Sequence, residues 1–206
     1  MEHKIITIGR QFGSGGHDIA EKLSQELGIP MYDRILVNKT AIKLGLTEGT
    51  VEEVDESIYN TFRSAYRYNG LAPHHVSLND CTFQAQKEII QNLAKKGPCI
   101  IVGRCADYIL RDYSQIIHIF ICASKNDRIH RIMERYGISK KEAELCIKRT
   151  DNRRRHYYET YTDHKWGSIE TYQLLLNISN LGIPPTLNLI KHIYTDSLLL
   201  TCSTTP

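Results

Sequence analysis

The sequence contains no hydrophobic run that approaches the roughly 20 residues needed to span a membrane. Neither sign of charge dominates, because 26 lysines and arginines are set against 23 aspartates and glutamates, a net charge of +3. Such a balance gives no global electrostatic reason to bind nucleic acid. We therefore expect a protein that acts neither in a membrane nor on nucleic acid.

Paired cysteines and zinc-binding spacings are also missing. None of the six cysteines forms a C-x-x-C pair, and no cysteines and histidines have the spacing of a zinc site. The N-terminus lacks a signal-peptide pattern. These absences predict a cytoplasmic protein with reduced thiols and no structural metal. Nothing in the sequence predicts its oligomeric state.

Short apolar segments alternate with helical segments along the chain. Strands are expected at residues 4–9, 29–32, 99–103, 115–123 and 172–178. Helices are expected at 17–27, 83–94, 106–113, 126–136, 140–158 and 184–200, and residues 33–96 are helical but interrupted. This alternation predicts an α/β/α fold, in which five parallel strands form a sheet with helices on both faces. Ligands of such folds bind at the carboxyl ends of the strands.

A glycine-rich turn, G-R-Q-F-G-S-G-G over residues 9–16, joins the first expected strand to the first expected helix. Backbone N–H groups in such a turn and the helix N-terminus form a concavity that binds phosphate. The residues expected to line it are Gly13, Ser14, Gly15 and Gly16, and a side chain at Gly15 is expected to fill it. An ordinary turn between a strand and a helix is the alternative.

The turn departs from the common phosphate-binding motif, G-x-x-x-x-G-K-[ST]. Arg10 stands at the first glycine, Gly16 at the lysine and His17 at the hydroxyl residue. Any function that needs bound phosphates must therefore do without that lysine. Arg10 or His17 is expected to supply the missing charge.

Charged residues follow two other strands at the same edge of the expected sheet. Arg104 comes directly after an apolar strand, where a ligand phosphate or carboxylate is the expected partner and a structural ion pair is the alternative. Asp33 and Arg34 follow the second strand. Asp33 is expected to accept a hydrogen bond from a ribose hydroxyl or to position magnesium through water, or else to cap a helix.

Arginines gather in the region expected to form two charged helices. The block comprises Arg128, Arg131, Arg135, Arg149, Arg153, Arg154 and Arg155, with Asp151 among them. Mobile guanidinium groups suit a phosphoryl group that passes between two substrates. A solvated charged face and a nucleic-acid patch are the alternatives. The aromatic residues at 156–161 and Trp166 are expected to pack on the core.

Together these segments resemble the cytidylate kinase-like group of P-loop nucleoside monophosphate kinases, whose loop reads R-Q-x-G-S-G-G without the lysine. The matching residues are 5–8, 10–16, 29–30, 32–34, 103–104, 106–107, 149, 151, 154, 157–158, 166–167 and 172–182. The resemblance covers nearly the full length, apart from residues 46–79.

The resemblance implies three parts and two cofactors, ATP and Mg²⁺. The parts are a core at 1–34, 97–124 and 161–206, a helical acceptor-binding insertion at 35–96, and an arginine-rich lid at 125–160. It implies that Asp33, Arg34 and Arg104 bind the acceptor, and that the glycine loop, His17, Arg128 and Arg131 bind ATP. The catalytic residues it implies are Arg10, His17, Arg149, Asp151 and Arg154.

The leading hypothesis is therefore phosphoryl transfer from ATP to a nucleoside monophosphate, with CMP or dCMP as the acceptor. One alternative is a kinase that phosphorylates another small molecule. A second alternative is a regulatory protein that binds nucleotide without chemistry, which Gly16 favours and the arginine-rich lid opposes. In each case the partner is a small nucleotide ligand.

Overall fold

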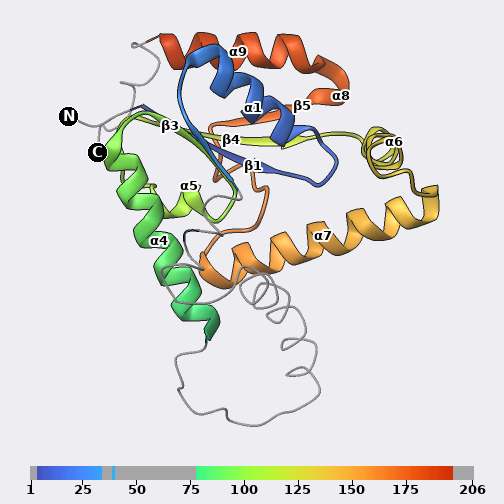
Figure 1. The fold of residues 1–206 in the computed structure, drawn as a ribbon, viewed down its shortest axis with the longest axis horizontal. Helices are drawn as coiled ribbons and strands as arrows, with labels where there is room; N and C mark the ends of the chain where they lie inside the picture. Colours follow the sequence, from blue (N-terminus) through green and yellow to red (C-terminus); the bar gives the residue numbers. More distant parts are fainter. Residues whose placement is uncertain (1–3, 34–38, 40–77, 197–206) are drawn as a thin grey trace.

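The computed structural model describes residues 4–33, 39 and 78–196 (Figure 1). Here a sheet is formed by β1 (Ile5–Arg10), β2 (Met31–Tyr32), β3 (Cys99–Val102), β4 (Ile116–Cys122) and β5 (Leu174–Asn177). The strand order is β2-β3-β1-β4-β5, and all neighbouring strands are parallel. The helices are α1 (Gly16–Leu27), α4 (Leu78–Lys96), α5 (Ala106–Ile109), α6 (Lys125–Tyr136), α7 (Lys140–Tyr161), α8 (Ile178–Leu181) and α9 (Ile183–Thr195). The expected α/β fold with a five-stranded parallel sheet is confirmed.

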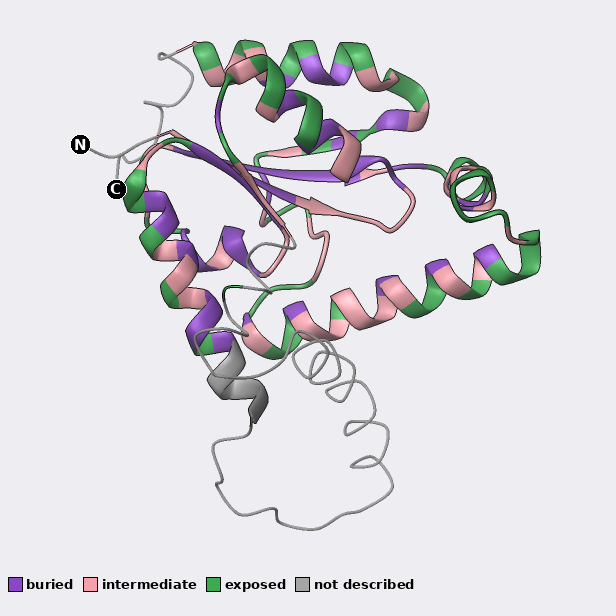
Figure 2. Ribbon diagram, in the orientation of Figure 1, coloured by how far each residue is buried: buried purple, intermediate pink, exposed green. Residues whose placement is uncertain are grey.

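Helices cover both faces of the sheet. Helices α1, α8 and α9 lie on one face, and α4, α5 and α7 lie on the other (Figure 1). The central strand β1 serves both layers, since Ile6 and Ile8 belong to the apolar cluster beneath α1 and α9, whereas Ile5 belongs to the cluster beside α4 and α5. Figure 2 shows the result as buried strands between helices whose outer sides are exposed. Burial on both faces explains why β1 is an unbroken apolar run.

Several element boundaries differ from the expected ones, among them those of β5, α5 and α9. The last apolar segment forms a strand only over Leu174–Asn177, because Asn177 caps α8 and its side chain accepts a hydrogen bond from the Ser179 N–H. Helix α5 is a single turn, Ala106–Ile109, that ends short of the expected residue 113. In α9 the helical hydrogen bonding ends at Thr195, with Asp196 as its cap.

Several predictions from the sequence lie outside the described residues. These are Arg34, the helical segments expected between residues 40 and 77, and residues 197–200, which were expected to belong to the last helix. Of the expected acceptor-binding insertion, the structure describes residue 39 and α4. No helix within the described ranges is both long enough and apolar enough to cross a membrane.

His118 makes the stability of this core depend on pH. It is buried in β4 with its Nδ1 2.7 Å from Thr7 Oγ1, and burial lowers the pKa of His118 to about 4. The unfolded chain binds this proton near pH 6.5, so the unfolded state binds more protons between the two values. We expect the free energy of unfolding to fall as the pH drops from about 6.5 to about 4, by about 1.4 kcal/mol per unit at most from this residue.

Denaturant unfolding of the wild type and of His118→Gln at several pH values checks this prediction. Glutamine can still bond to Thr7 but does not titrate, so the variant should lose this part of the slope. Equal slopes in the two proteins would assign the acid sensitivity to other groups.

Candidate active site

The glycine-rich turn joins β1 to α1 and is anchored at the end of β4. Gly13 and Gly15 have φ of +76° and +79°, in the left-handed region that favours glycine. The backbone N–H of Gln11 donates to the Ile121 carbonyl over 3.1 Å, and the Gln11 side chain accepts from the Ala123 N–H over 3.2 Å. The first N–H groups of α1 have no acceptor within the helix. This turn can therefore bind an anion at the N-terminus of α1.

At two of the residues expected to line the concavity, Ser14 and Gly15, the side-chain direction leads away from it. Ser14 is fully buried, and its hydroxyl donates to the Gln11 carbonyl over 2.9 Å. A Cβ at Gly15 would lie 3.1 Å from Ile178 Cδ1 and 3.4 Å from Arg131 Nη1. The expectation that a side chain at Gly15 fills the phosphate concavity is thus wrong, because it would press on α8 and α6 instead.

The position of the missing lysine is closed to any side chain. A Cβ at Gly16 would lie 2.7 Å from the Cβ of Arg10 and 3.3 Å from the Cβ of Ile121. Both contacts are shorter than ordinary van der Waals separations, and neither partner is the flexible end of a side chain. Gly16 is therefore required because the side chain of Arg10 starts where that of the lysine would start.

The guanidinium of Arg10 ends beside Gly103, at the carboxyl end of β3. A Cβ at Gly103 would lie only 2.1 Å from Arg10 Nη1, so this glycine leaves the space that the guanidinium fills. Arg10 Nη2 lies 3.4 Å from Asp33 Oδ1. Burial lowers the pKa of Arg10, Asp33 opposes that shift, and the positive charge of Arg104 adds to it. The structure thus holds a largely buried cation between the phosphate loop and the end of β3.

Asp33 also contacts His17, the residue that replaces the usual hydroxyl. His17 Nε2 lies 3.5 Å from Asp33 Oδ2, and the buried His17 Nδ1 has no hydrogen-bond partner among the described residues. Magnesium prefers oxygen ligands and often keeps several waters alongside one carboxylate and the substrate phosphates. The described residues contain no cluster of three or more histidine, cysteine or acidic side chains. Asp33 fits a magnesium ion that arrives with nucleotide phosphates.

Three consecutive left-handed residues shape the turn after β3. Gly103, Arg104 and Cys105 have φ of +76°, +57° and +54°, and the last two are not glycine. The turn is fixed by hydrogen bonds from the Gly103 N–H to the Ile8 carbonyl and from the Ala106 N–H to the Gly103 carbonyl. Strained backbone of this kind costs about 1 kcal/mol or more per residue and concentrates at functional sites. Here it directs Arg104 toward α7, where its guanidinium carbon lies 5.9 Å from the centre of the Tyr157 ring.

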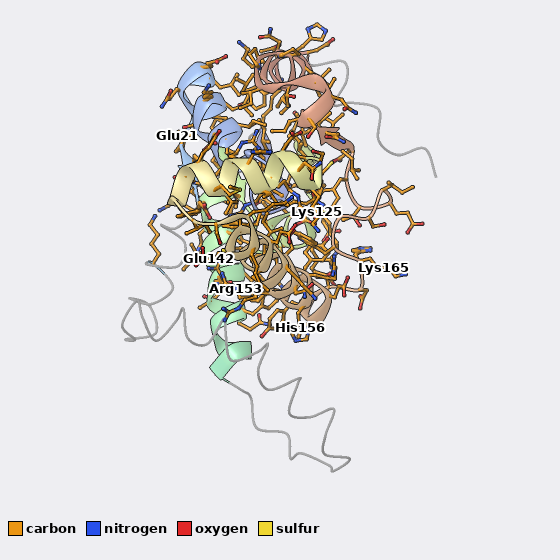
Figure 3. All side chains as sticks on the ribbon, turned by 90° about the vertical axis from the view of Figure 1, so that its right-hand side faces the viewer. Glu21, Lys125, Glu142, Arg153, His156 and Lys165 are labelled. Carbon is orange, nitrogen blue, oxygen red and sulfur yellow. The ribbon has the colours of Figure 1, made fainter. Side chains whose placement is uncertain are left out.

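A cavity of about 340 Å³ opens at the carboxyl ends of β1 and β3 and is bounded by α7. One wall is charged and consists of Arg10, Asp33, Arg104, Arg153 and Arg154. Arg153 projects from α7, which is seen end-on in Figure 3, whereas α6 lies across that view. Burial and then the charge of Arg10 lower the pKa of Arg154 to about 9, and Asp151 and Asp33 oppose the shift. This cluster of arginines favours an anionic ligand, because a negative charge would offset the repulsion between the guanidinium groups.

Another part of the cavity wall is aromatic and carries hydroxyl groups. It consists of Tyr157, Tyr158, Trp166 and Tyr172, and Asp107 also lines the cavity. The Tyr158 hydroxyl donates to Asp107 Oδ2 over 2.5 Å, and the Tyr172 hydroxyl is bonded to the same pair. Burial raises the pKa of Asp107 and of both tyrosines. This wall suits a flat ring or a sugar better than a second phosphate.

The arginines of the α6–α7 hairpin separate into groups with different partners. Arg128, Arg131 and Arg154 donate to the carbonyls of Phe12, Gly13 and Arg10, respectively. Asp151 accepts hydrogen bonds from the Phe12 N–H and from Arg128. Arg149 is exposed on α7 and does not line the cavity. Of the residues predicted from the sequence, Arg10, Asp33, Arg104 and Arg154 come together in the cavity.

The sequence reasoning missed the aromatic wall and Asp107 as parts of the site. Tyr158 was expected to pack on the core, and it does so, but its hydroxyl also reaches the cavity. Arg153 was recognised only as a member of the basic block. The available signal was the spacing of Arg154 and Tyr158, which lie one helical turn apart on the same face of α7.

Comparisons with known proteins find relatives that match nearly the whole chain. The family model described as "Cytidylate kinase-like family" matches residues 5–180. A cytidylate kinase from Methanosphaera stadtmanae is 26% identical over 190 residues, which cover 91% of this chain and 95% of the relative. An uncharacterized protein from Eubacterium ventriosum has a solved structure with a TM-score of 0.70 and 29% identity, covering 93% of this chain and 98% of that one.

A more distant solved structure supports the fold alone. The shikimate kinase from Bacteroides thetaiotaomicron has a TM-score of 0.51 at 10% identity, over 92% of this chain and 97% of that one. The family match extends from the phosphate loop through the cavity and the arginine-rich hairpin. The chain belongs to the cytidylate kinase-like family.

Proposed function

We propose that the protein transfers the terminal phosphoryl group of ATP to a nucleoside monophosphate, with CMP and dCMP as the first candidates. The observation that carries the proposal is the cavity beside the phosphate loop, whose charged wall combines Arg10, Arg104, Arg153 and Arg154. A phosphate acceptor requires such a wall, and its sugar and base would lie against the tyrosines and Trp166. Family membership supports the same class of reaction.

In this proposal the chain's residues position the two substrates and neutralise their charge, and none of these residues forms a covalent bond with a substrate. An oxygen of the acceptor phosphate attacks the terminal phosphorus of ATP, the bond to the bridging oxygen breaks, and ADP leaves with that electron pair. The phosphate loop holds the donor at the N-terminus of α1. Arg104 and Arg153 hold the acceptor phosphate, and Arg10 and Arg154 neutralise charge on the transferring group. Magnesium bound to ATP would neutralise the donor phosphates, with Asp33 available to order its waters.

The regulatory alternative needs only a donor site. A protein that merely binds ATP gains nothing from a second, arginine-lined cavity next to the loop, so this cavity favours the enzyme. Another phosphorylated acceptor remains compatible with the charged wall. We therefore propose measuring ADP release from Mg-ATP across a panel of monophosphates, with CMP and dCMP first. Turnover with one nucleotide supports the proposal, whereas ATP binding without turnover for any nucleotide contradicts it.

Replacing Arg104 with alanine is expected to affect the acceptor and not the donor. Its side chain lines the cavity, whereas residues 13–16 of the phosphate loop do not, and a charge-assisted hydrogen bond contributes about 1.5–3 kcal/mol. We expect the KM for the acceptor to rise about 10- to 100-fold, with the affinity for ATP nearly unchanged. Steady-state kinetics and calorimetry separate the two effects.

Arg111→Ala is the matched control for that variant. Arg111 is exposed beyond α5, bonds to the Tyr108 carbonyl and does not line the cavity. It should leave both affinities unchanged. Weaker ATP binding with unchanged acceptor KM in Arg104→Ala would show that donor and acceptor occupy the opposite places.

A further inference from the structure

The phosphate loop is joined to the α6–α7 hairpin through the side chain of Phe12. This loop residue packs into the apolar cluster that holds the two helices of the hairpin together, formed by Ile129, Ile132, Ala143 and Ile147. Its ring is stacked with that of Tyr136 at 6.4 Å, and the Arg154 guanidinium lies 5.6 Å from its centre. A residue of the loop thus forms part of the hydrophobic core of the hairpin.

The loop backbone also lies directly on α6. A Cβ at Gly13 would stand 3.0 Å from the backbone carbonyl oxygen of Arg128 and 3.0 Å from Ile132 Cγ1. A side chain at Gly13 would require α6 to move by a few tenths of an ångström. The contact is therefore as close as packing within a single domain.

Three arginines of the hairpin bind loop carbonyls. Arg154 donates to the Arg10 carbonyl over 3.1 Å, and Arg131 donates to the Gly13 carbonyl over 2.7 Å. Arg128 donates to the Phe12 carbonyl over 3.4 Å. In a trans peptide the N–H of the next residue points away from the carbonyl. By holding the Phe12 carbonyl, the hairpin directs the Gly13 N–H away from α6.

Asp151 completes these contacts from α7. It is buried, and its Oδ1 accepts the Phe12 N–H over 2.7 Å, while Oδ2 pairs with Arg128. Both carboxylate oxygens are thus engaged with the loop and with the arginine that holds it. Asp151 does not line the cavity that carries the proposed acceptor site.

We propose that Asp151, Arg128 and Arg131 are positioning residues that shape the phosphate loop from behind, and that α6 and α7 move with this loop rather than opening away from it. The resemblance implied that these residues act in catalysis and ATP binding. Here their charges hold the backbone that binds the phosphates. The inference rests on the proposed function only in taking nucleotide phosphates as the ligand of the loop.

Hydrogen–deuterium exchange of the free protein tests this inference without any need for turnover. In Asp151→Asn the charge opposite Arg128 is lost, and in Asp151→Ala the acceptor for the Phe12 N–H is lost as well. We expect amides of residues 11–17 to exchange at least 10-fold faster in the alanine variant, with a smaller increase in the asparagine variant. The dissociation constant for ATP should rise in the same order, and the acceptor KM should stay within twofold.

Arg135→Ala is the matched control, since Arg135 joins the hairpin to Asp18 of α1 over 3.4 Å without touching the loop. Its loop exchange and ATP affinity should equal those of the wild type. Unchanged loop exchange in both folded Asp151 variants, together with a loss of kcat, would overturn the inference and assign Asp151 to the reacting groups. Adding ATP could also overturn the inference. If the amides of α6 and α7 near Phe12 then exchanged faster, the hairpin would be opening away from the loop. If the protein phosphorylates no acceptor, the proposed function fails, but the exchange experiment still tests this inference because it needs no turnover.

Discussion

Replacing Arg10 with alanine is expected to lower kcat by about 100- to 1,000-fold, the usual effect of removing one donor that stabilises transition-state charge. Arg10 begins where the missing lysine would begin, beside Gly16, and its guanidinium ends in the acceptor cavity beside Gly103. It is thus the cation best placed between donor and acceptor. The affinities for both substrates should fall much less than kcat, which single-turnover kinetics and calorimetry measure separately. Thermal unfolding must show that the variant is folded.

A double variant tests whether Arg10 does the work of the lysine. Lysine at position 16 alone collides with the Cβ of Arg10, at 2.7 Å from the new Cβ, so Gly16→Lys by itself should be inactive or unstable. Arg10→Gly combined with Gly16→Lys removes that collision and returns a cation to the common position. We expect the double variant to regain at least 10-fold in kcat over Arg10→Ala. Wild-type kcat in folded Arg10→Ala would show that the charge is supplied elsewhere, for example by His17.

The sequence was sufficient to predict the layers of this fold, because buried parallel strands appear as unbroken apolar runs. It was less able to predict where those runs end. Leu174–Leu176 and Ile178 share the same apolar character, and the capping bond between the Asn177 side chain and the Ser179 N–H ends the strand. A bond of that kind depends on how the chain turns, and the composition of the segment does not reveal it.

The site was predictable to the extent that strand ends meet at one edge of a sheet. This rule correctly brought Arg10, Asp33 and Arg104 together. It could not distinguish the partners of the arginines in the hairpin, since a guanidinium binds a backbone carbonyl as readily as a phosphate oxygen. Arg128 and Arg131 therefore gave the same pattern as Arg153 and Arg154, although only the latter two line the cavity.

The largest effect away from a charged residue is expected for Gly103→Ala. A Cβ there would lie 2.1 Å from Arg10 Nη1, so the guanidinium must leave its place between the loop and β3. The left-handed φ of +76° adds backbone strain of about 1 kcal/mol. We expect kcat to fall by about 100-fold, approaching the loss in Arg10→Ala. Because both changes act on the same guanidinium, the double variant should lose little more than Arg10→Ala alone.

Gly28→Ala separates backbone strain from displacement of Arg10. Gly28 ends α1 with φ of +65°, and a Cβ there would have no atom of the described residues within 4 Å, so the substitution adds strain without a collision in this part of the chain. Gly28→Ala should lower the melting temperature by about the amount that backbone strain contributes in Gly103→Ala. It should leave kcat unchanged. If Gly103→Ala keeps full activity, Arg10 can work from another position, and the narrow space at Gly103 does not fix the cation. If losses in Gly103→Ala and Arg10→Ala simply add, the glycine acts through Arg104 and the strained turn rather than through Arg10.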